Sequence, residues 1–297
     1  MTVKQLRRLH SGTVSRAYLP PAELRKHLLC VIERNTSGCD LNSLQAFTYG
    51  PASPNLTITW IWKGQTERLL EWRPDDLEAP REQLNASILL RGGSTAPWIH
   101  YSNQPMHFLI AVFRPDALQE LFGLEASDVL NKIQPFQQST IGQHWKDWAQ
   151  QIMAAGDSRT ALPILYQGLD QQAVSEAVTG HHPELAEHWL ARLQGHASSK
   201  SQRTLQRRIS QLTGTNLRQL RRFIRIEQFA LLVGSLLKNQ NQQLDQADLA
   251  AEVGFSDQPH MAREVKRITG FSVGETLRRF LHDESFWLYR TKLRLHI

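Results

Sequence analysis

LAAEVGFSDQPHMAREVKRITG, residues 249–270, has the pattern of a helix, a tight turn and a second helix. Leu249 and Val253 are apolar residues four positions apart, and Gly254 is a residue that readily takes the positive φ at which helices end. Asp257 is a favoured N-cap residue for the helix that follows. We therefore predict a helix-turn-helix unit in this stretch.

The second helix of this unit has an apolar face and a polar face. Met261 and Val265, four residues apart, form its buried side, and the small Ala250 allows the first helix to cross close by. The outward side chains carry donors and acceptors that are long enough to reach base edges in a major groove: Gln258, His260, Arg263 and Lys266. This face therefore predicts nucleic-acid recognition.

A weaker copy of the same pattern precedes it in LQGHASSKSQRTLQRRISQLTG, residues 193–214. Leu205 and Ile209 repeat the buried pair at positions four apart. Arg pairs well with guanine and Gln with adenine, so base reading is predicted for the outward side chains Arg203, Gln206 and Arg207. Lys200 and Arg208 suit phosphate contacts.

The segment between the two units, residues 215–237, reads TNLRQLRRFIRIEQFALLVGSLL and is amphipathic at helical spacing. At about 1.5 Å per residue such a helix is about 35 Å long. Successive major-groove faces on one side of a duplex lie about 34 Å apart. One chain could therefore present two reading helices to adjacent groove segments.

The positive charge is concentrated in the last third of the chain. The net charge is +6, but residues 195–297 hold 17 Lys and Arg against 9 Asp and Glu, and the rest of the chain balances at −2. Between Glu187 and Glu227 there are nine basic residues and no acidic residue. A solvated helix face commonly mixes both signs, whereas one sign alone favours a polyanionic partner, so nucleic acid is the leading expectation.

The first half of the chain carries strand signals. Runs of β-branched and aromatic residues closed by Gly or Pro occur in TITWIWKG (57–64), ASILLRGG (86–93) and MHFLIAVFRP (106–115). The chain is helical in pattern from Gln143 onward. We predict an α+β fold with a sensor or dimerisation domain at 1–145, a helical linker region at 146–190 and a DNA-binding domain at 191–297.

The sequence has no pattern typical of a membrane, secreted or metal-binding protein. No apolar run reaches the roughly 20 residues of a membrane span, and the N-terminus has no signal-peptide pattern, so a cytoplasmic location is expected. Cys30 and Cys39 form neither a disulfide framework nor a zinc pair. We expect no metal and no cofactor.

Residues 193–280 resemble the double helix-turn-helix domain of AraC/XylS-type bacterial transcription regulators. The second unit follows the family pattern A-x-x-x-G-F, then D-Q, then R-x-F-K-R-x-x-G, and SQRTLQRR (201–208) fits S-x-R-x-L-x-R of the first unit. The chain departs from the pattern at Val265, where the family usually has Phe. It also departs at Pro259, which replaces a common Ser or Gln, and at Ser272-Val273, which replaces Thr or Ser followed by Pro.

The resemblance implies a sequence-specific regulator that binds double-stranded operator or promoter DNA, either as an activator or as a repressor. It places six side chains at base-contact positions: Arg203, Gln206, Arg207, Gln258, His260 and Arg263. Basic neighbours suit phosphate contacts: Lys200, Arg208, Arg218, Arg221 and Lys266.

The first half also resembles the N-terminal regions of some AraC-like regulators. The matching stretches are AYLPPAELRKHL (17–28) and FLIAVFRPDALQELFG (108–123). They imply a cupin-like β domain used for effector sensing or dimerisation, and therefore a small-molecule effector, a homodimer and, for an activator, contact with RNA polymerase. The cell compartment implied is the bacterial cytoplasm, at the nucleoid.

Two other classes of function stay open at this point. A DNA-repair enzyme of the alkyl-transfer type would need a nucleophile, but Cys30 lies in the apolar run LLCVI, interpreted as helical and buried, and Cys39 has no basic neighbour to lower its pKa. The other class is an effector-binding sensor that acts mainly through protein contacts.

Aromatic and basic residues of the β region bear on the sensor hypothesis. Trp60, Trp62, Trp98, His100 and Tyr101 either fill a β core, which we favour, or line a pocket. Arg91, His100 and Arg114 either recognise an acidic effector or are solvated at strand ends. The effector-binding residues are not identified by the sequence.

Overall fold

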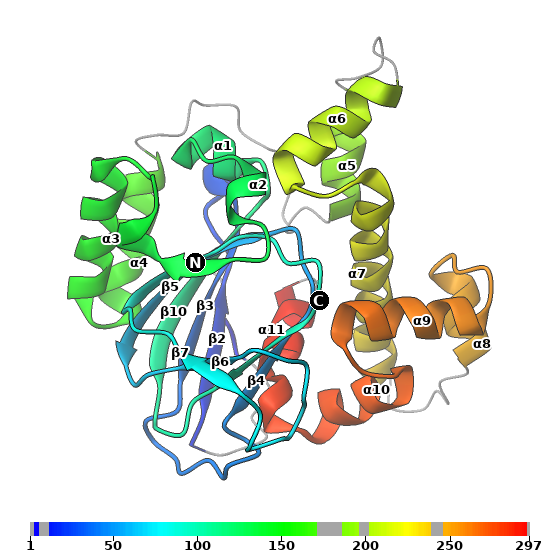
Figure 1. Cartoon of the computed structure of the whole chain (residues 1–297), viewed down its shortest axis with the longest axis horizontal. Helices are drawn as coiled ribbons and strands as arrows, with labels where there is room; N and C mark the ends of the chain where they lie inside the picture. The colour runs from blue at the N-terminus through cyan, green and yellow to red at the C-terminus, as the bar shows by residue number, and fades with distance from the viewer. Residues whose placement is uncertain (1–2, 6–11, 171–185, 196–201, 239–245, 296–297) are drawn as a thin grey trace.

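The computed structural model describes residues 3–5, 12–170, 186–195, 202–238 and 246–295. The N-terminal region is a β domain with flanking helices, and the C-terminal region is helical throughout the residues described (Figure 1). The α+β prediction is therefore confirmed, and the strands of the described residues all lie within the first 135 positions.

Two antiparallel sheets form the β domain. The larger has the strand order β1-β2-β3-β10-β5-β8-β11 and the smaller the order β4-β9-β6-β7. The strands of the larger sheet are β1 (Val3–Gln5), β2 (Val14–Tyr18), β3 (Leu28–Asn35), β10 (His107–Phe113), β5 (Leu56–Lys63), β8 (Ile88–Arg91) and β11 (Ile133–Pro135). Those of the smaller are β4 (Phe47–Gly50), β9 (Trp98–Tyr101), β6 (Glu67–Leu69) and β7 (Arg81–Gln83).

The alternation of residues along the central strands gives the larger sheet two distinct faces. In β5, Ile58 and Trp60 belong to the main core, whereas Thr57 and Thr59 face the space between the sheets. Strand β10 alternates in the same way, because successive side chains of a strand point to opposite faces. The sheet therefore has a dry outer face and an inner face that lines a cavity.

Helices cover the dry face: α1 (Ala117–Phe122), α2 (Ala126–Val129), α3 (Gln143–Ala155) and α4 (Ser158–Asp170), with the short 3-10 segments η1 (Ala22–Leu24) and η2 (Phe136–Gln138). The Trp60 indole N–H donates to the Ala149 carbonyl at 2.9 Å and its ring meets Trp148 edge-on. Trp60 therefore belongs to the core, as favoured, and the partly buried Trp62 packs against it. Helices α3 and α4, expected within or beside a linker region, share this core because their apolar faces pack on the sheet.

One local prediction is wrong. The run LLCVI around Cys30 forms part of strand β3 rather than a helix. A short continuous apolar run fits a fully buried strand as well as a buried helix, so periodicity could not distinguish them. The prediction that Cys30 is buried is nevertheless correct, since its exposed fraction is 2%.

The helical region has a core of its own around one long helix. Its elements are α5 (Ala186–Gly195), α6 (Gln202–Thr213), α7 (Leu217–Lys238), α8 (Gln246–Glu252), α9 (Gln258–Thr269), α10 (Val273–His282), η3 (Glu284–Phe286) and α11 (Trp287–Leu295). None of the helices within the described residues is long and apolar enough to cross a membrane.

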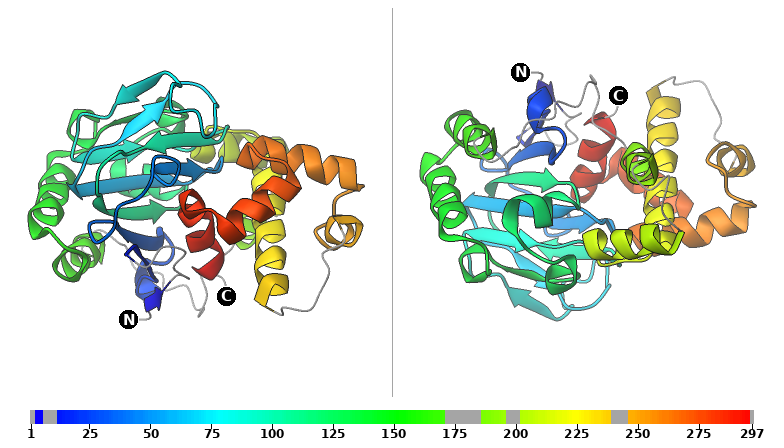
Figure 2. Two further views of the ribbon diagram at one scale, coloured as in Figure 1. Left: turned by 90° about the horizontal axis from the view of Figure 1, so that it is seen from below. Right: turned by 90° about the horizontal axis from the view of Figure 1, so that it is seen from above.

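The last helix returns to the β domain. Figure 2 shows α11 between the sheets and α7, and it contacts β2 and β4. The Arg34 guanidinium of β3 donates to the Glu284 carboxylate at 2.7 Å, with both side chains nearly inaccessible to solvent. Helix α11, placed by the sequence within the DNA-binding domain at 191–297, therefore packs on both regions.

A second ion pair joins the two regions beside an aromatic cluster. Arg279 of α10 donates to Asp75, which also accepts from the Tyr49 hydroxyl at 2.8 Å, and the Tyr49 ring meets Phe271 edge-on at 5.2 Å. Burial raises the pKa of Asp75, but the hydrogen bonds from Arg279 and Tyr49 outweigh it and leave the pKa lowered. This contact therefore stabilises the fold above about pH 4 and is lost as the pH falls below that value.

We predict that Arg34→Met destabilises the protein by about 3 kcal/mol, because it leaves the Glu284 carboxylate buried with less compensation. The double variant Arg34→Met with Glu284→Met should recover most of this loss. Urea unfolding of the whole chain measures both.

Arg68→Met is the matched control, since the Arg68–Glu82 pair is exposed and should contribute less than about 1 kcal/mol. Equal losses from Arg34→Met and Arg68→Met would contradict a structural role for the buried pair.

Candidate nucleic-acid interface

The second predicted unit has the expected geometry. Helix α8 ends before Gly254, whose φ is +77°, and the Phe255 N–H donates to the Ala250 carbonyl at 2.9 Å. The Asp257 carboxylate then caps α9 by accepting from the His260 backbone N–H at 2.6 Å. That hydrogen bond is the main cause of a lowered pKa of Asp257. The turn residues thus fix where α9 begins and which of its faces is buried.

The apolar side of each reading helix is buried as predicted. Met261 and Val265 of α9 are 0% exposed, and so is Ile209 of α6, with Leu205 half-buried beside it. Val265, where Phe is usual in the resembling family, fills its place in this core. The opposite faces of α6 and α9 are therefore the ones left to meet solvent.

Most of the predicted contact residues are exposed on these faces or on α7: Arg203, Gln206, Arg207, Arg208, Arg218, Arg221, Gln258, Arg263 and Lys266. Lys200 lies outside the described residues. His260 differs from the others because it is half-buried, with its ring against Phe255 and its Nδ1 atom 3.0 Å from the Ser256 hydroxyl.

The two reading helices end in the same way, which the sequence interpretation missed. At the end of α6 the Thr213 hydroxyl donates to the Ile209 carbonyl at 2.8 Å and accepts from the N–H two residues on, with Gly214 at φ +67°. At the end of α9 the Thr269 hydroxyl does the same with Val265, with Gly270 at φ +82°. The sequence shows this shared helix end as the similar triplets Leu-Thr-Gly at 212–214 and Ile-Thr-Gly at 268–270.

A charge contact that was not anticipated holds α9 on α7. The Arg222 Nε atom lies 3.0 Å from the Glu264 carboxylate, both largely buried, although the N–H is not aligned as a hydrogen bond. Burial and the neighbouring Arg side chains lower the pKa of Arg222, whereas Glu264 acts to raise it. A single buried carboxylate therefore offsets some of the crowded positive charge beneath the reading surface.

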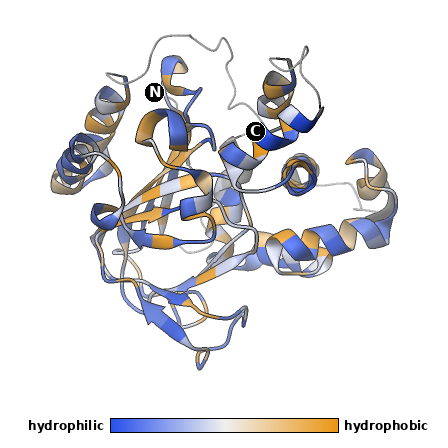
Figure 3. Ribbon diagram, turned by 45° about the horizontal axis from the view of Figure 1, so that its top comes forward, coloured by the Kyte–Doolittle hydropathy of each residue, from blue (hydrophilic) through white to orange (hydrophobic). Residues whose placement is uncertain are grey.

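The helices lie at different points along α7. Figure 1 shows α6 beside the start of α7 and α9 crossing it further along, and Figure 3 shows hydrophilic residues on the outer faces. At about 1.5 Å per residue, the 22 residues of α7 extend about 33 Å. Because α9 contacts α7 at Arg222, in its second turn, the helix packing rather than the full length of α7 sets the spacing of the reading helices.

Residues 196–279 match a protein-family model described as a helix-turn-helix domain. No curated protein matches this chain. Among solved structures, ToxT from Vibrio cholerae O395 matches at 10% identity and a TM-score of 0.37, covering 90% of this chain and 98% of that one. The AraC-like transcriptional activator CuxR matches at 9% identity and a TM-score of 0.28, covering 95% and 90%.

The structural similarities are too weak to carry an argument, so the assignment depends on the domain match and on the two units themselves. Residues 196–279 form a helix-turn-helix domain, as the sequence pattern predicted. The chain therefore carries a helix-turn-helix domain beside an N-terminal β domain.

We predict that Glu264→Gln raises the affinity for random DNA and lowers the ratio of specific to random binding. Loss of a negative charge strengthens the attraction of the protein to DNA phosphates. Loss of the charge contact with Arg222 also holds α9 less firmly on α7, which reduces discrimination between bases. Competition binding with operator and random duplexes at two salt concentrations measures both quantities.

Glu252→Gln is the control, because Glu252 is an exposed carboxylate on α8. It should strengthen binding to both duplexes alike. A specificity ratio that falls equally in both variants would rule out a positioning role for Glu264.

Proposed function

We propose that α6 and α9 read adjacent major-groove segments of one operator and that the N-terminal domain sets their relative position. The observation that carries this proposal is a repeated unit: two helices with an exposed polar face, a buried apolar face and the same Thr-Gly end. A repeated device of this kind suits a duplex, whose groove repeats about every 34 Å.

The proposed roles follow from side-chain chemistry. Base contacts are assigned to Arg203, Gln206, Arg207, Gln258, His260 and Arg263, because bidentate donors and acceptors distinguish bases. Phosphate contacts are assigned to Lys200, Arg208, Arg218, Arg221 and Lys266, which act as charges without reading sequence. Double-stranded DNA is the proposed partner.

The N-terminal domain contacts the C-terminal end of each reading helix. Gly214, just after α6, lies against Leu130, and Ala52 donates its N–H to the Ile268 carbonyl near the end of α9 at 2.9 Å. Trp72 packs so closely on Gly270 that a Cβ atom there would have no room. Since the polar faces themselves stay exposed, regulation through this domain would act by geometry and not by covering the reading surface.

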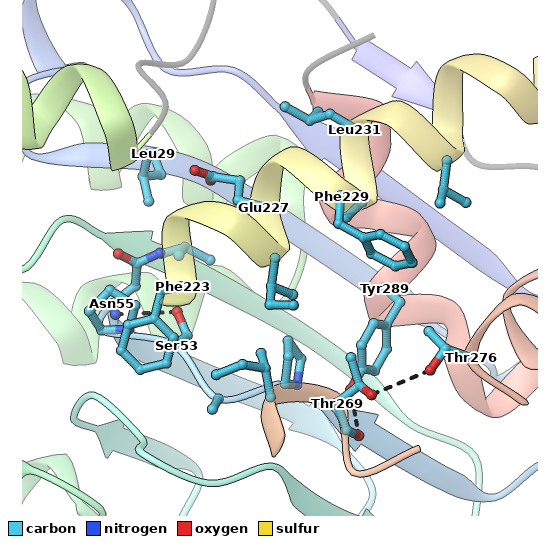
Figure 4. Close-up of a pocket in the computed structure, with 18 of the residues that line it drawn as sticks. Leu29, Ser53, Asn55, Phe223, Glu227, Phe229, Leu231, Thr269, Thr276 and Tyr289 are labelled. Atoms are coloured by element: carbon cyan, nitrogen blue, oxygen red, sulfur yellow. Dashed lines mark hydrogen bonds between the residues drawn. The ribbon is translucent and has the colours of Figure 1, made fainter. Parts of the chain in front are cut away.

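A small-molecule effector is the input we propose for this regulation. The junction between the β domain and the helical region encloses a cavity of about 170 Å³. Figure 4 shows it between α7, the 53–55 loop of the β domain, and residues of α9, α10 and α11; the labelled residues include Phe223, Phe229, Ser53, Asn55, Thr269, Thr276 and Tyr289. An effector altering this junction would move both reading helices.

We propose no enzymatic role. Cys30 is buried in β3, and burial is the main cause of a raised pKa of the Cys39 thiol, so neither thiol is activated as a nucleophile. Within the ranges described, no group of three or more His, Cys, Asp and Glu side chains is arranged to hold a metal ion. The compartment we propose is the cytoplasm.

We predict different effects from two arginine substitutions. Arg207→Ala should relax base preference at one operator position, with a loss of about 1–3 kcal/mol, because a base contact is removed. Arg221→Ala should weaken binding to all sequences alike and reduce the salt slope by about one unit, because a phosphate contact is removed. Mobility-shift titrations on the DNA upstream of the gene measure both.

Arg159→Ala, an exposed substitution on α4, is the control and should leave DNA binding unchanged. Identical behaviour of the Arg207 and Arg221 variants would refute the division into reading and anchoring residues. Absence of any sequence-specific shift would refute the proposed function itself.

Trp72→Ala should lower specific DNA affinity about fivefold without changing base preference. Releasing the end of α9 adds conformational freedom that DNA binding must remove, at a cost of about 1 kcal/mol. Leu77→Ala, at an exposed position in the same loop, is the control. An affinity that is unchanged or higher would show that the contact does not preorganise α9.

A further inference from the structure

A second cavity, of about 100 Å³, lies between the two sheets of the β domain. The inner face of the larger sheet lines it through the alternate residues of β5, β8 and β10, including Thr57, Thr59, Leu89 and Phe108. The opposite wall comes from the smaller sheet and from Trp287 and Leu288 of α11. The cavity is therefore inside the sensor domain but is partly closed by the last helix of the chain.

A half-buried arginine, Arg91, lines this cavity. The Arg91 guanidinium hydrogen-bonds His100 Nε2 at 2.5 Å and lies 4.2 Å from the centroid of the Trp98 ring. Burial is the main cause that lowers the pKa of Arg91, to about 9. Within the portion of the chain that the structure describes, Arg91 forms no ion pair with a carboxylate.

The surroundings of Arg91 add positive charge instead of cancelling it. Arg68, opposite His100 in the β6–β9 pairing, acts to lower the pKa of Arg91, and the nearby Glu82 is bound to Arg68 at 2.7 Å. Burial and then Arg91 lower the pKa of His100 well below its usual value, so the ring is neutral. Because an arginine only donates, Nε2 of His100 accepts and its proton sits on Nδ1.

A buried cation without a counter-charge is costly, and a ligand anion removes that cost. The planar guanidinium matches a carboxylate, with which it can form two parallel hydrogen bonds. The strand register places Thr57 opposite Arg91 and Thr59 opposite Leu89. The Thr57 hydroxyl thus lies beside Arg91, and the apolar Leu89 lies two residues further along its strand, opposite Thr59.

We infer that this cavity binds a small organic acid, with its carboxylate on Arg91 and a short apolar tail between Leu89 and Phe108. The inference rests on the proposed effector role and assigns the effector to the cavity between the sheets, whose wall helix α11 also lines the junction cavity through Tyr289. Arg114, grouped with Arg91 and His100 from the sequence, is excluded from this site because it donates to the Arg25 carbonyl and borders the junction cavity.

The test is isothermal titration of the whole chain, without DNA, with butyrate and with its neutral isostere butyramide. Butyrate should bind at least about tenfold more tightly, because only the acid compensates Arg91. Arg91→Gln should abolish this preference. Arg73→Gln, the same change at a more exposed arginine of this domain, should retain it.

A second variant guards against misfolding of Arg91→Gln. Thr59→Phe fills the cavity from the middle of β5 while keeping Arg91, so butyrate binding should be lost at unchanged secondary structure. Equal binding of acid and amide, retained preference in Arg91→Gln, or unchanged binding in Thr59→Phe would each overturn the inference, as would tighter binding of inorganic phosphate than of butyrate. Since no DNA is present, these outcomes are independent of whether the chain binds an operator.

Discussion

The arrangement of the molecule depends on the anchoring of its C-terminal end in the N-terminal sheet. Arg34 is a strand residue with almost no solvent access, and the carboxylate that compensates it, Glu284, comes from 250 positions further along the chain. Arg34 has no other carboxylate partner among the described residues, and Glu284 would keep only the longer contact with Arg290, so the pair favours having the two halves in place together. Arg279 and Asp75 form a second such pair, in which Arg279 is buried but Asp75 keeps more contact with water.

This anchoring places internal and external constraints on the helical region. Internally, α7 and the Arg222–Glu264 contact determine where α9 packs. Externally, the β domain contacts the end of α6 through Leu130 and the end of α9 through Ala52. A shift of the Leu130 contact or of the Ala52 contact therefore changes the relative position of α6 and α9, although their polar faces are exposed to solvent.

Much of this was predictable from local sequence chemistry. Gly254 and Asp257 located the second helix-turn-helix unit because a positive φ and an N-cap are requirements of single residues. The β-branched and aromatic residues of TITWIWKG, closed by Gly, likewise predicted a strand, and a core position was favoured for Trp60. Cys30 was misplaced because a short apolar run carries no period. The contact between the β domain and the helical region was not predictable, since nothing in the sequence near Glu284 indicates a partner at Arg34. The contact of Glu264 with Arg222 was not predictable either, because the sequence shows Glu264 only as one acidic residue among basic ones.

The position of α11 also bears on how the sensor and the reader are connected. Trp287 donates its indole N–H to Thr48 of β4, packs on Phe108 of β10 and lines the cavity that contains Arg91. Three residues earlier in the same segment, Glu284 holds Arg34. A ligand in that cavity would thus contact the same segment that fixes the helical region to the sheet. If DNA binding changes the placement of α11, and with it the affinity of the cavity for the ligand, the two binding events are coupled. The ligand then changes the affinity for DNA by the same factor, because coupling between two binding equilibria is reciprocal.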